Sequence, residues 1–474
     1  LGALALAARG RHAGALESLT SLASASTPAS AAAATPRPRR DRRARILLLA
    51  AVLMGATSLA FEVLWTRILV FYLGSSVYAF SLMLLGFLLG IALGSLAIGR
   101  MVDRLVSPFA LLAAVELGIA ATAPLSIWLF TTLNARQIAL SEALHPQSFG
   151  VAIFAQLLAV LPILLPPTLL MGVSFPLLVR VYSVTRKGGE RIGSDLGELY
   201  GANTLGCIAG SLGAGFVLIP LLGTQNALLA VGAVCALLGW LFAHQAAGTA
   251  GGLTALRTLA LAAAPLLVAL AFLLPADRVI LAAGIFGSDR PGDLVHFHED
   301  ASAAVAIRNK TDAAGPYLSL ELNGVNVAGS SPDLYAVQKM QGHLPLLLGQ
   351  SPGASVVHIG FGSGGTAHAV SRHPVSAIHI VEISPAVLAA SDRYFSGINH
   401  AVLADPRVRV EINDGRNFLL ATTEVFDAVL SDSLHPRYAG NGSLYSEEYF
   451  RIVAERLTPG GAVSMLLPIY TVPP

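Results

Sequence analysis

A succession of long apolar runs between Ile46 and Pro275 constrains this chain more than any other feature. A helix needs about 20 predominantly apolar residues to cross the hydrocarbon core of a bilayer. The composition agrees with a membrane location, because 54% of residues are hydrophobic and 12% are charged, against about 25% charged in a typical soluble domain. We therefore expect a helical membrane domain over 46–275, with candidate spans at 46–65, 76–99, 109–131, 152–179, 200–221, 225–243 and 257–275.

Small residues recur at four-residue spacing inside these runs, as in Gly86, Gly90 and Gly94. Small residues let helices approach closely in lipid, so the spacing favours tight helix packing. Ionisable residues inside such a region are costly and need partners. Glu62 and Arg67 are therefore interpreted either as an interfacial pair or as the wall of a polar cavity for a substrate.

The segment before the first apolar run bears on orientation. Residues 1–45 are rich in Ala, Ser, Thr and Pro, are expected to be disordered, and end in an arginine-rich stretch of the kind that stays cytoplasmic. The net charge of +2 gives no case for nucleic acid. Seven full crossings would leave everything after residue 275 outside the cell. The cofactor chemistry below favours the cytoplasmic side of a bacterial inner membrane, so we expect either 152–179 or 259–274 not to be one simple crossing.

The two cysteines, Cys207 and Cys235, both lie in apolar runs. Each is interpreted as a small core residue. We therefore expect neither a disulfide scaffold nor a metal site.

After residue 275 the sequence has the texture of a soluble protein. Residues 293–330 alternate apolar and polar positions, which is typical of half-buried strands. Asn323-Gly324 is a strong signal for a two-residue hairpin turn. We expect a β-hairpin module and a linking helix over 276–350, with the helix at 333–349.

A buried strand running into a glycine-rich turn spans Val356–Gly365, and a helix is expected from Thr366. Glycines let the backbone bend sharply and let a ligand approach where a Cβ would collide. Helix N-termini also favour anionic groups. A tight strand-to-helix turn gives the same pattern, so the stretch alone is a weak signal. Its glycines are Gly360, Gly362, Gly364 and Gly365.

Carboxylates at the ends of the strands that follow make the glycine turn more specific. Strands are predicted at 377–383, 408–413, 426–432 and 462–467, alternating with helices, which indicates a parallel sheet with ligands at its carboxyl ends. Glu382 follows Gly360 by 22 residues, where an acidic residue accepts hydrogen bonds from ribose hydroxyls. Asp414 can reach the adenine amino group, or serve as an ordinary turn residue before Gly415. Together with Asp432 they predict an adenosyl-binding, Rossmann-like domain over 351–474.

Residues 300–467 resemble the spermidine synthase family, aminopropyltransferases built on the S-adenosylmethionine methyltransferase fold. The segments that carry this resemblance are Leu322–Gly324, His343–Leu346, Gly360–Gly365, Val381–Pro385, Asp414–Arg416, Ser431–Ser433 and Leu444–Ser446. The helical half is similar to the N-terminal region of membrane-fused members of that family, through Phe61–Arg67, Leu170–Pro176 and Leu199–Gly206. The resemblance implies decarboxylated S-adenosylmethionine or S-adenosylmethionine as donor and a catalytic role for Asp432. His435, three residues on, is a further catalytic candidate from its own chemistry. The resemblance also implies donor contacts from Gly360, Gly362, Ser363, Gly364, Gly365, Glu382, Asp414 and Gly415.

Departures from the family pattern fall on the side of the amine substrate. Ser363 stands where the family keeps an Asp, and Val337-Gln338-Lys339 stands where it keeps Tyr-His-Glu. Val327 replaces a Gln, and His435 replaces the Asp that holds the diamine. A cation such as Lys339 would repel a diamine. Asp432 remains as a base or amine-orienting group, and His435 either acts as a base near pH 7 or caps the loop.

The leading hypothesis is a membrane-bound transferase of polyamine biosynthesis that moves an aminopropyl group to an amine acceptor. Methyl transfer from S-adenosylmethionine to a different, hydrophobic acceptor is the alternative. A third hypothesis is a transporter with a non-catalytic adenosyl-sensing domain, because Gly94–Arg104 is similar to a loop signature of major facilitator transporters. Membrane lipid is an expected partner and a homodimer is left open. The family fold adds a sixth and a seventh strand, so we expect this chain to be truncated after the fifth.

Overall fold

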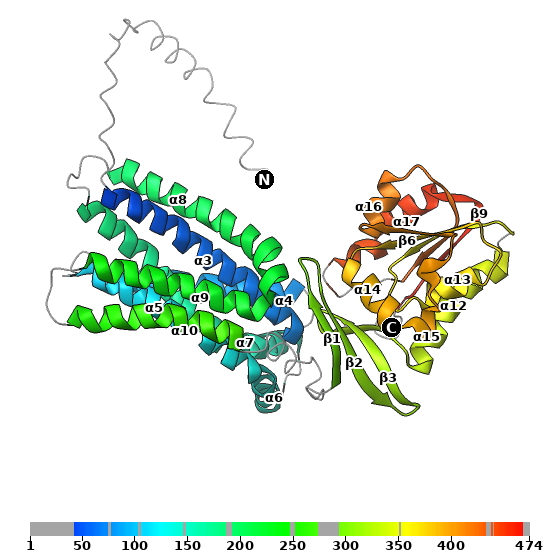
Figure 1. Cartoon of the computed structure of the whole chain (residues 1–474), viewed down its shortest axis with the longest axis horizontal. Helices are drawn as coiled ribbons and strands as arrows, with labels where there is room; N and C mark the ends of the chain where they lie inside the picture. Colours follow the sequence, from blue (N-terminus) through cyan, green and yellow to red (C-terminus); the bar gives the residue numbers. More distant parts are fainter. Residues whose placement is uncertain are drawn as a thin grey trace, which may run out of the picture. The chain divides into compact units, whose positions relative to one another are not determined.

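The computed structural model describes residues 42–73, 77–102, 105, 107–145, 148–185, 192–246, 252–273, 293–349, 352–432, 438 and 440–467. The chain divides into two compact units, 1–45 and 46–474. Of the first unit only residues 42–45 are described, and they are helical. The second unit contains a group of apolar helices, an antiparallel sheet and a parallel sheet (Figure 1).

The apolar runs form helices, as the sequence predicts. These are α3 (Arg42–Leu73), α4 (Val77–Gly99), α5 (Pro108–Thr131), α6 (Leu133–Leu144), α7 (Phe149–Thr185), α8 (Ile192–Gly213), the π-helical turn η3 (Ala214–Leu218), α9 (Ile219–Gln245) and α10 (Gly252–Leu273). Among the described residues, five helical stretches are long and apolar enough to cross a membrane: Arg42–Leu73, Phe80–Gly99, Pro108–Thr131, Phe149–Thr185 and Leu196–Gln245.

The number of spans differs from the seven that the sequence predicts. The predicted spans 200–221 and 225–243 join into the single stretch Leu196–Gln245, which is interrupted at Gly223, where φ is 74° and ψ is 161°. A straight helix of 50 residues would be about 75 Å long, more than twice the thickness of the hydrocarbon core. The break at Gly223 therefore restores two segments of spanning length. The predicted span 257–275 falls in α10, whose apolar stretch is shorter, and its last two residues lie outside the described ones.

Glycines set the spacing between helices that are distant in the sequence. Gly206 and Gly210 of α8 lie against the carbonyl groups of Val52 and Ala56 in α3, so a Cβ at either position would collide with the backbone. Gly94 of α4 lies in the same way against the backbone of α7. The prediction that small residues serve helix packing is thus supported by the contacts they make.

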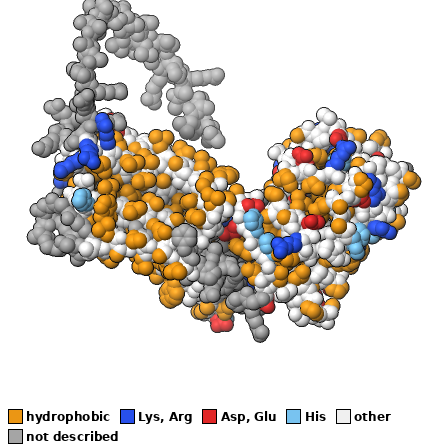
Figure 2. All heavy atoms as spheres, viewed as in Figure 1, with side chains coloured by type: hydrophobic (Ala, Val, Ile, Leu, Met, Phe, Trp, Pro, Cys, Tyr) orange, Lys and Arg blue, Asp and Glu red, His pale blue; other side chains and the backbone are white. Residues whose placement is uncertain are grey.

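The helical region presents an apolar outer surface. Orange apolar side chains cover most of its visible face (Figure 2). Large side chains of η3 and α9 are more than half exposed, with Phe216 at 68% and Leu221 at 75%. A soluble protein rarely exposes a contiguous apolar patch of this kind, so the surface favours contact with lipid.

An antiparallel sheet follows the helices. It comprises β1 (Leu294–Glu299), β2 (Ala304–Asp312), β3 (Gly315–Leu322) and β4 (Val325–Gly329), in the order β1-β2-β3-β4. The predicted turn is confirmed, because Asn323 and Gly324 join β3 to β4 with φ of 50° and 77°.

Polar contacts connect the end of β1 to the apolar helices. The Glu299 carboxylate accepts hydrogen bonds from the backbone N–H (2.8 Å) and the hydroxyl (2.7 Å) of Thr224, the residue at which α9 resumes after its break. Arg67 of α3 donates from Nη2 to the carbonyl oxygen of Asp300 (2.9 Å). The carboxylate thus satisfies N–H donors that a helix start leaves without an intrahelical partner.

The C-terminal region is built on a parallel sheet, as the alternation of strands and helices predicts. Its strands are β5 (Ser355–Ile359), β6 (Ala377–Glu382), β7 (Val408–Ile412), β8 (Phe426–Ser431) and β9 (Leu457–Met465), in the order β7-β6-β5-β8-β9. The chain leaves β5 toward β6 on one side and later returns to β8 on the other, so the carboxyl end of β5 is the switch point where ligands bind in such sheets.

Helices cover both faces of this sheet (Figure 1). They are α12 (Pro332–Gly349), α13 (Gly365–Ser371), α14 (Pro385–Tyr394), α15 (Ser396–Asn399), α16 (Gly415–Ala421) and α17 (Glu447–Glu455), with 3₁₀ turns η5 (Val402–Ala404) and η6 (Asn441–Tyr445). Alternate residues of β5 enter different cores, as strand geometry requires. Val356 packs with Ala367 and Val370 of α13, whereas Val357 packs with Leu419 of α16 and Val453 of α17. The antiparallel sheet packs its inner face on α14.

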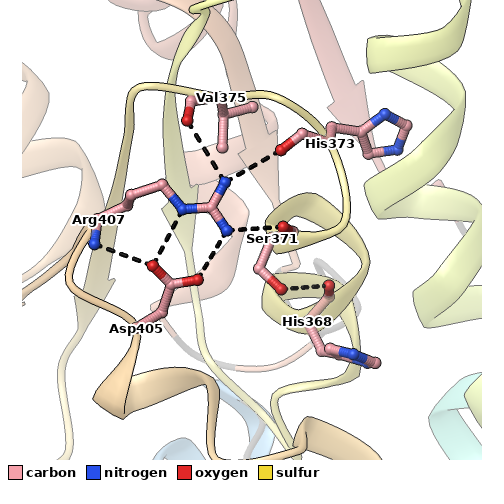
Figure 3. A network of polar contacts seen from close by, with 6 residues as sticks. All are labelled: His368, Ser371, His373, Val375, Asp405 and Arg407. Carbon is pink, nitrogen blue, oxygen red and sulfur yellow. Dashed lines mark hydrogen bonds and ion pairs between the residues drawn. The ribbon is translucent and has the colours of Figure 1, made fainter.

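Arg407 anchors the C-terminal end of α13 (Figure 3). Its guanidinium donates to the carbonyl oxygens of Ser371 (2.7 Å), His373 (3.1 Å) and Val375 (3.4 Å). The same group forms a bidentate ion pair with Asp405, which lowers the pKa of that carboxyl. Helix C-termini leave carbonyl oxygens unpaired, and here one arginine satisfies them.

Candidate active site

The glycine turn after β5 is the first component of the site. Gly360, Gly362 and Gly364 have φ of 84°, 53° and 83°, a region that glycine adopts readily and other residues rarely. At Gly360 a Cβ would also lie 2.6 Å from the carbonyl oxygen of Asp432. The backbone therefore approaches the end of β8 closely, and it does so only because Gly360 has no side chain.

Side chains behind the turn fix its conformation. The Ser391 hydroxyl of α14 donates to the carbonyl of Gly362 (2.6 Å), and the Asn399 amide of α15 donates to the carbonyl of Ser363 (3.3 Å). Ser363 itself is fully buried and donates its hydroxyl to Oε1 of Gln338 in α12 (2.8 Å). The turn is thus held by three helices that are distant from it in the sequence.

Glu382 ends β6, beside the turn, as predicted. Its Oε2 accepts from the backbone N–H of Phe361 (2.8 Å) and its Oε1 accepts from that of Ser384 (2.9 Å). Burial raises the pKa of Glu382, and the N–H groups of Phe361, Ser384 and Ile383 oppose that rise. Each carboxylate oxygen retains a lone pair, so the group can also accept from a pair of ligand hydroxyls.

Asp432 directly follows β8, on the other side of β5. The hydroxyl of Thr366, in the first turn of α13, donates to Oδ2 (3.5 Å) and is the side-chain partner of Asp432 among the described residues. Burial raises the pKa of Asp432 to about 7, the hydrogen bond from Thr366 opposes the rise, and the charge of Glu382 adds to it. A carboxyl with this pKa exchanges a proton near neutral pH.

Of the remaining predicted site residues, the structure describes Asp414 and Gly415 but not His435. Asp414 follows β7 and accepts from the backbone N–H of Asn417 (2.9 Å), so it is the N-cap of α16. This cap uses one oxygen and leaves the predicted contact with an adenine amino group as a prediction. Gly415 lies against the Ile359 side chain, where a Cβ would collide. His435 falls outside the described residues.

Three residues near the site were missed or named only as departures. Gln338 and Gln341 lie three positions apart on the buried face of α12, with exposures of 7% and 8%. Gln338 contacts Ser363, while Gln341 donates from Nε2 to the carbonyl of Ser431 (3.0 Å). Thr366 faces Asp432. Two amides at i and i+3 on an apolar helix face are the signal that would have identified the pair.

The region that contains the glycine turn and the two carboxylates is similar to known proteins. Residues 334–466 match the family model described as the spermine/spermidine synthase domain. We call these residues the synthase domain after that match. The glycine turn, Glu382 and Asp432 all lie inside the matched residues.

Relatives of the synthase domain include two proteins of Streptomyces coelicolor. Polyamine aminopropyltransferase 2 is 30% identical over 312 residues, which cover 62% of this chain and 52% of that protein. Polyamine aminopropyltransferase 1 is 28% identical over 437 residues, which cover 89% of this chain and 76% of that protein. The second match extends well beyond the synthase domain, so the helical region is fused to it in that relative also. The chain thus spans about half the length of the first relative.

Solved structures give a further likeness to the synthase domain. A crystal structure of spermidine synthase in complex with the transition-state analogue AdoDATO is 23% identical, with a TM-score of 0.32, and the match covers 35% of this chain and 55% of that one.

Proposed function

We propose that this chain is a membrane-anchored aminopropyltransferase that moves an aminopropyl group from decarboxylated S-adenosylmethionine to an amine. The observation that carries the proposal is the placement of two carboxylates, the buried Glu382 and the half-buried Asp432, at the ends of the strands on either side of β5, the switch point of the sheet. The names of the matching relatives favour the same chemistry.

The proposed donor site lies between the glycine turn and Glu382. The adenosine ribose places its two hydroxyls at the free lone pairs of Glu382, and the nucleoside body passes over Gly360 and Gly362. Asp414 contacts the adenine amino group if it releases one oxygen from its cap. This assignment rests on the strand-end geometry and on the resemblance of the turn to that of the family.

Asp432 is the proposed base on the acceptor side. The amine nitrogen attacks the propyl carbon next to the sulfonium, the C–S bond breaks, and methylthioadenosine leaves as a neutral thioether. The proton lost by the new ammonium passes to the Asp432 carboxylate, whose pKa of about 7 lets it accept and later release that proton. His435, predicted from the sequence, is a second candidate for the same proton.

Methyl transfer from S-adenosylmethionine is the second candidate, favoured by one contact. Ser363, buried and bonded to Gln338, leaves no carboxylate at that point of the turn. The nucleoside of S-adenosylmethionine carries an extra carboxylate, which a neutral serine tolerates better than an aspartate would.

The deciding experiment is product mass spectrometry with the full chain in membranes, supplied with each donor and a pool of amines and lipids. A mass gain of an aminopropyl group supports the first proposal, and a gain of a methyl group supports the second. Product loss in Asp432→Asn with activity retained in Glu62→Gln separates an enzyme from a transporter. Transport of a metabolite without turnover of either donor would contradict both transfer proposals.

The proposed location is a bacterial inner membrane with the synthase domain on its cytoplasmic side, because the donor is made in the cytosol. Five helices long and apolar enough to cross a membrane support the membrane location. Labelling of single cysteines introduced at exposed positions of the synthase domain, by a membrane-impermeant maleimide on intact cells, tests the side. Labelling before lysis would place the domain outside.

A further inference from the structure

The Asp432 side of the site is bounded by helix α12, whose buried face carries amides instead of charges. Its buried residues are Gln338, Gln341, Gly342, Pro345 and Leu346. The helix packs against α13 and β9, so this face lies beside the carboxyl end of the sheet. The polar groups that α12 presents there are therefore two uncharged side chains.

Gln341 has a buried oxygen with no partner. Its Nε2 donates to the carbonyl of Ser431, the residue immediately before Asp432. That carbonyl can only accept, so the amide cannot be turned the other way without placing two oxygens against each other. The orientation is thus fixed, and Oε1 is left buried and without a hydrogen bond in the structure. Such an orphan acceptor indicates a missing N–H or O–H donor.

Gln338 completes the neutral lining one turn away. Its Oε1 accepts from Ser363 and lies so close to Gly365 that a Cβ at that position would collide with it. The Ser363 hydroxyl has one O–H donor, and this hydrogen bond uses it. The pair therefore brings no negative charge to the space between α12 and the glycine turn.

The charged groups near Asp432 also do not favour an acceptor with a second ammonium. Among the described residues, Glu382 is the one charged group that shifts the pKa of Asp432, and its oxygens are bonded to backbone N–H groups on the donor side. Lys339, on the next position of α12, is a cation whose Nζ lies 2.6 Å from Nδ1 of His368 and 5.0 Å from the centre of the Tyr335 ring. None of Gln338, Lys339 and Gln341 on this helix offers a carboxylate to a second ammonium of the acceptor.

We propose that the acceptor end of the site, bounded by Gln338, Gln341 and Asp432, selects a primary amine whose remaining body is uncharged over a diamine. This inference rests on the proposed aminopropyl transfer. The reacting nitrogen donates one N–H to Oε1 of Gln341 and gives its proton to Asp432. The uncharged body avoids the large penalty of burying an unpaired charge.

A matched pair of acceptors tests the selection directly. Pentan-1-amine and butane-1,4-diamine have the same number of heavy atoms and differ by a methyl in place of an ammonium. With the full chain in nanodiscs and decarboxylated S-adenosylmethionine as donor, kcat/KM is expected to be about tenfold or more higher for the monoamine. Preference for the diamine would overturn the inference while leaving the proposed transferase intact. Turnover of neither amine, nor of any amine in a broad pool, would instead count against the proposed function.

Two substitutions at one position assign the selection to Gln341. Gln341→Glu adds a carboxylate that must turn away from the Ser431 carbonyl, and it is expected to shift the diamine-to-monoamine ratio of kcat/KM at least about tenfold toward the diamine. Gln341→Met keeps the length but removes the acceptor oxygen, so the KM for the monoamine should rise while the affinity for methylthioadenosine stays unchanged. An unchanged ratio in Gln341→Glu, with methylthioadenosine still bound, would overturn the assignment. Equal loss of donor and amine affinity in Gln341→Met would show a merely structural role and would also overturn it.

Discussion

The two carboxylates at the carboxyl edge of the parallel sheet, the buried Glu382 and the half-buried Asp432, receive different hydrogen bonds from the protein. Glu382 receives two short hydrogen bonds from backbone N–H groups, one on each oxygen. Among the described residues, the side-chain donor to Asp432 is the hydroxyl of Thr366, at 3.5 Å. Fixed donors hold a carboxylate in place as a binding group, whereas a carboxylate with few donors holds its proton more tightly and is suited to proton transfer.

The largest expected effect is the loss of the proton acceptor. Asp432→Asn keeps the size of the side chain but removes its basicity, so kcat is expected to fall about 10²- to 10⁴-fold. The affinity for methylthioadenosine should change little, because Glu382 and the glycine turn are untouched. Single-turnover kinetics together with calorimetric titration measure the two quantities. The control is Asp392→Asn, an exposed residue of α14 that should behave as wild type. Equal losses of donor affinity and kcat would erase the distinction between the two carboxylates.

The pH dependence of the wild type is the next largest effect. Because burial raises the pKa of Asp432 to about 7, the base form declines about tenfold per pH unit below that value. At saturating donor and amine, kcat should therefore fall about 50-fold from pH 7 to pH 5 and level off above pH 7. If kcat instead falls only around the usual pKa of a carboxyl group, Asp432 is not the base that titrates.

Substitution of Glu382 should affect donor affinity more than kcat, the opposite of the effect expected for Asp432. Glu382→Gln places an NH₂ group against one of two backbone N–H donors, which leaves that donor buried and unpaired. Affinity for methylthioadenosine should weaken about 10- to 100-fold, while kcat at saturating donor falls much less. Glu455→Gln, at the exposed end of α17, is the matched control. A kcat loss as large as that of Asp432→Asn would make Glu382 part of the reacting machinery.

The smallest expected effect concerns Thr366. Its hydrogen bond lowers the pKa of Asp432, so Thr366→Val should move the acid limb of the pH profile to higher pH by less than about one unit. Thr366→Ser retains the hydroxyl and should restore the wild-type profile. If the limb of Thr366→Val stays in place, the 3.5 Å contact does not tune Asp432.

The periodic parts of this fold could be predicted from the sequence. The five parallel strands, the Asn323-Gly324 turn and the glycine turn after β5 follow from alternation and from glycine placement, and all are present. The break at Gly223 lies between the predicted spans 200–221 and 225–243, so this boundary also follows from the sequence.

The positions of the site residues at strand ends could be predicted from the sequence. The hydrogen bonds that these residues receive could not. That Glu382 and Asp432 end neighbouring strands on either side of β5 follows from strand order, which the fold family implies. Their unequal hydrogen bonding depends on the N–H of Phe361 and the hydroxyl of Thr366, which are placed by tertiary packing. The orphan oxygen of Gln341 has the same origin, since it requires the carbonyl of Ser431 to occupy the other end of the amide.

The Arg407 anchor has a consequence for how ligands enter and leave. The guanidinium holds the end of α13 that is farthest from the glycine turn to Asp405. We therefore expect α13 to keep its place when donor and product exchange. The residence time of the nucleoside should then depend on other segments of the rim.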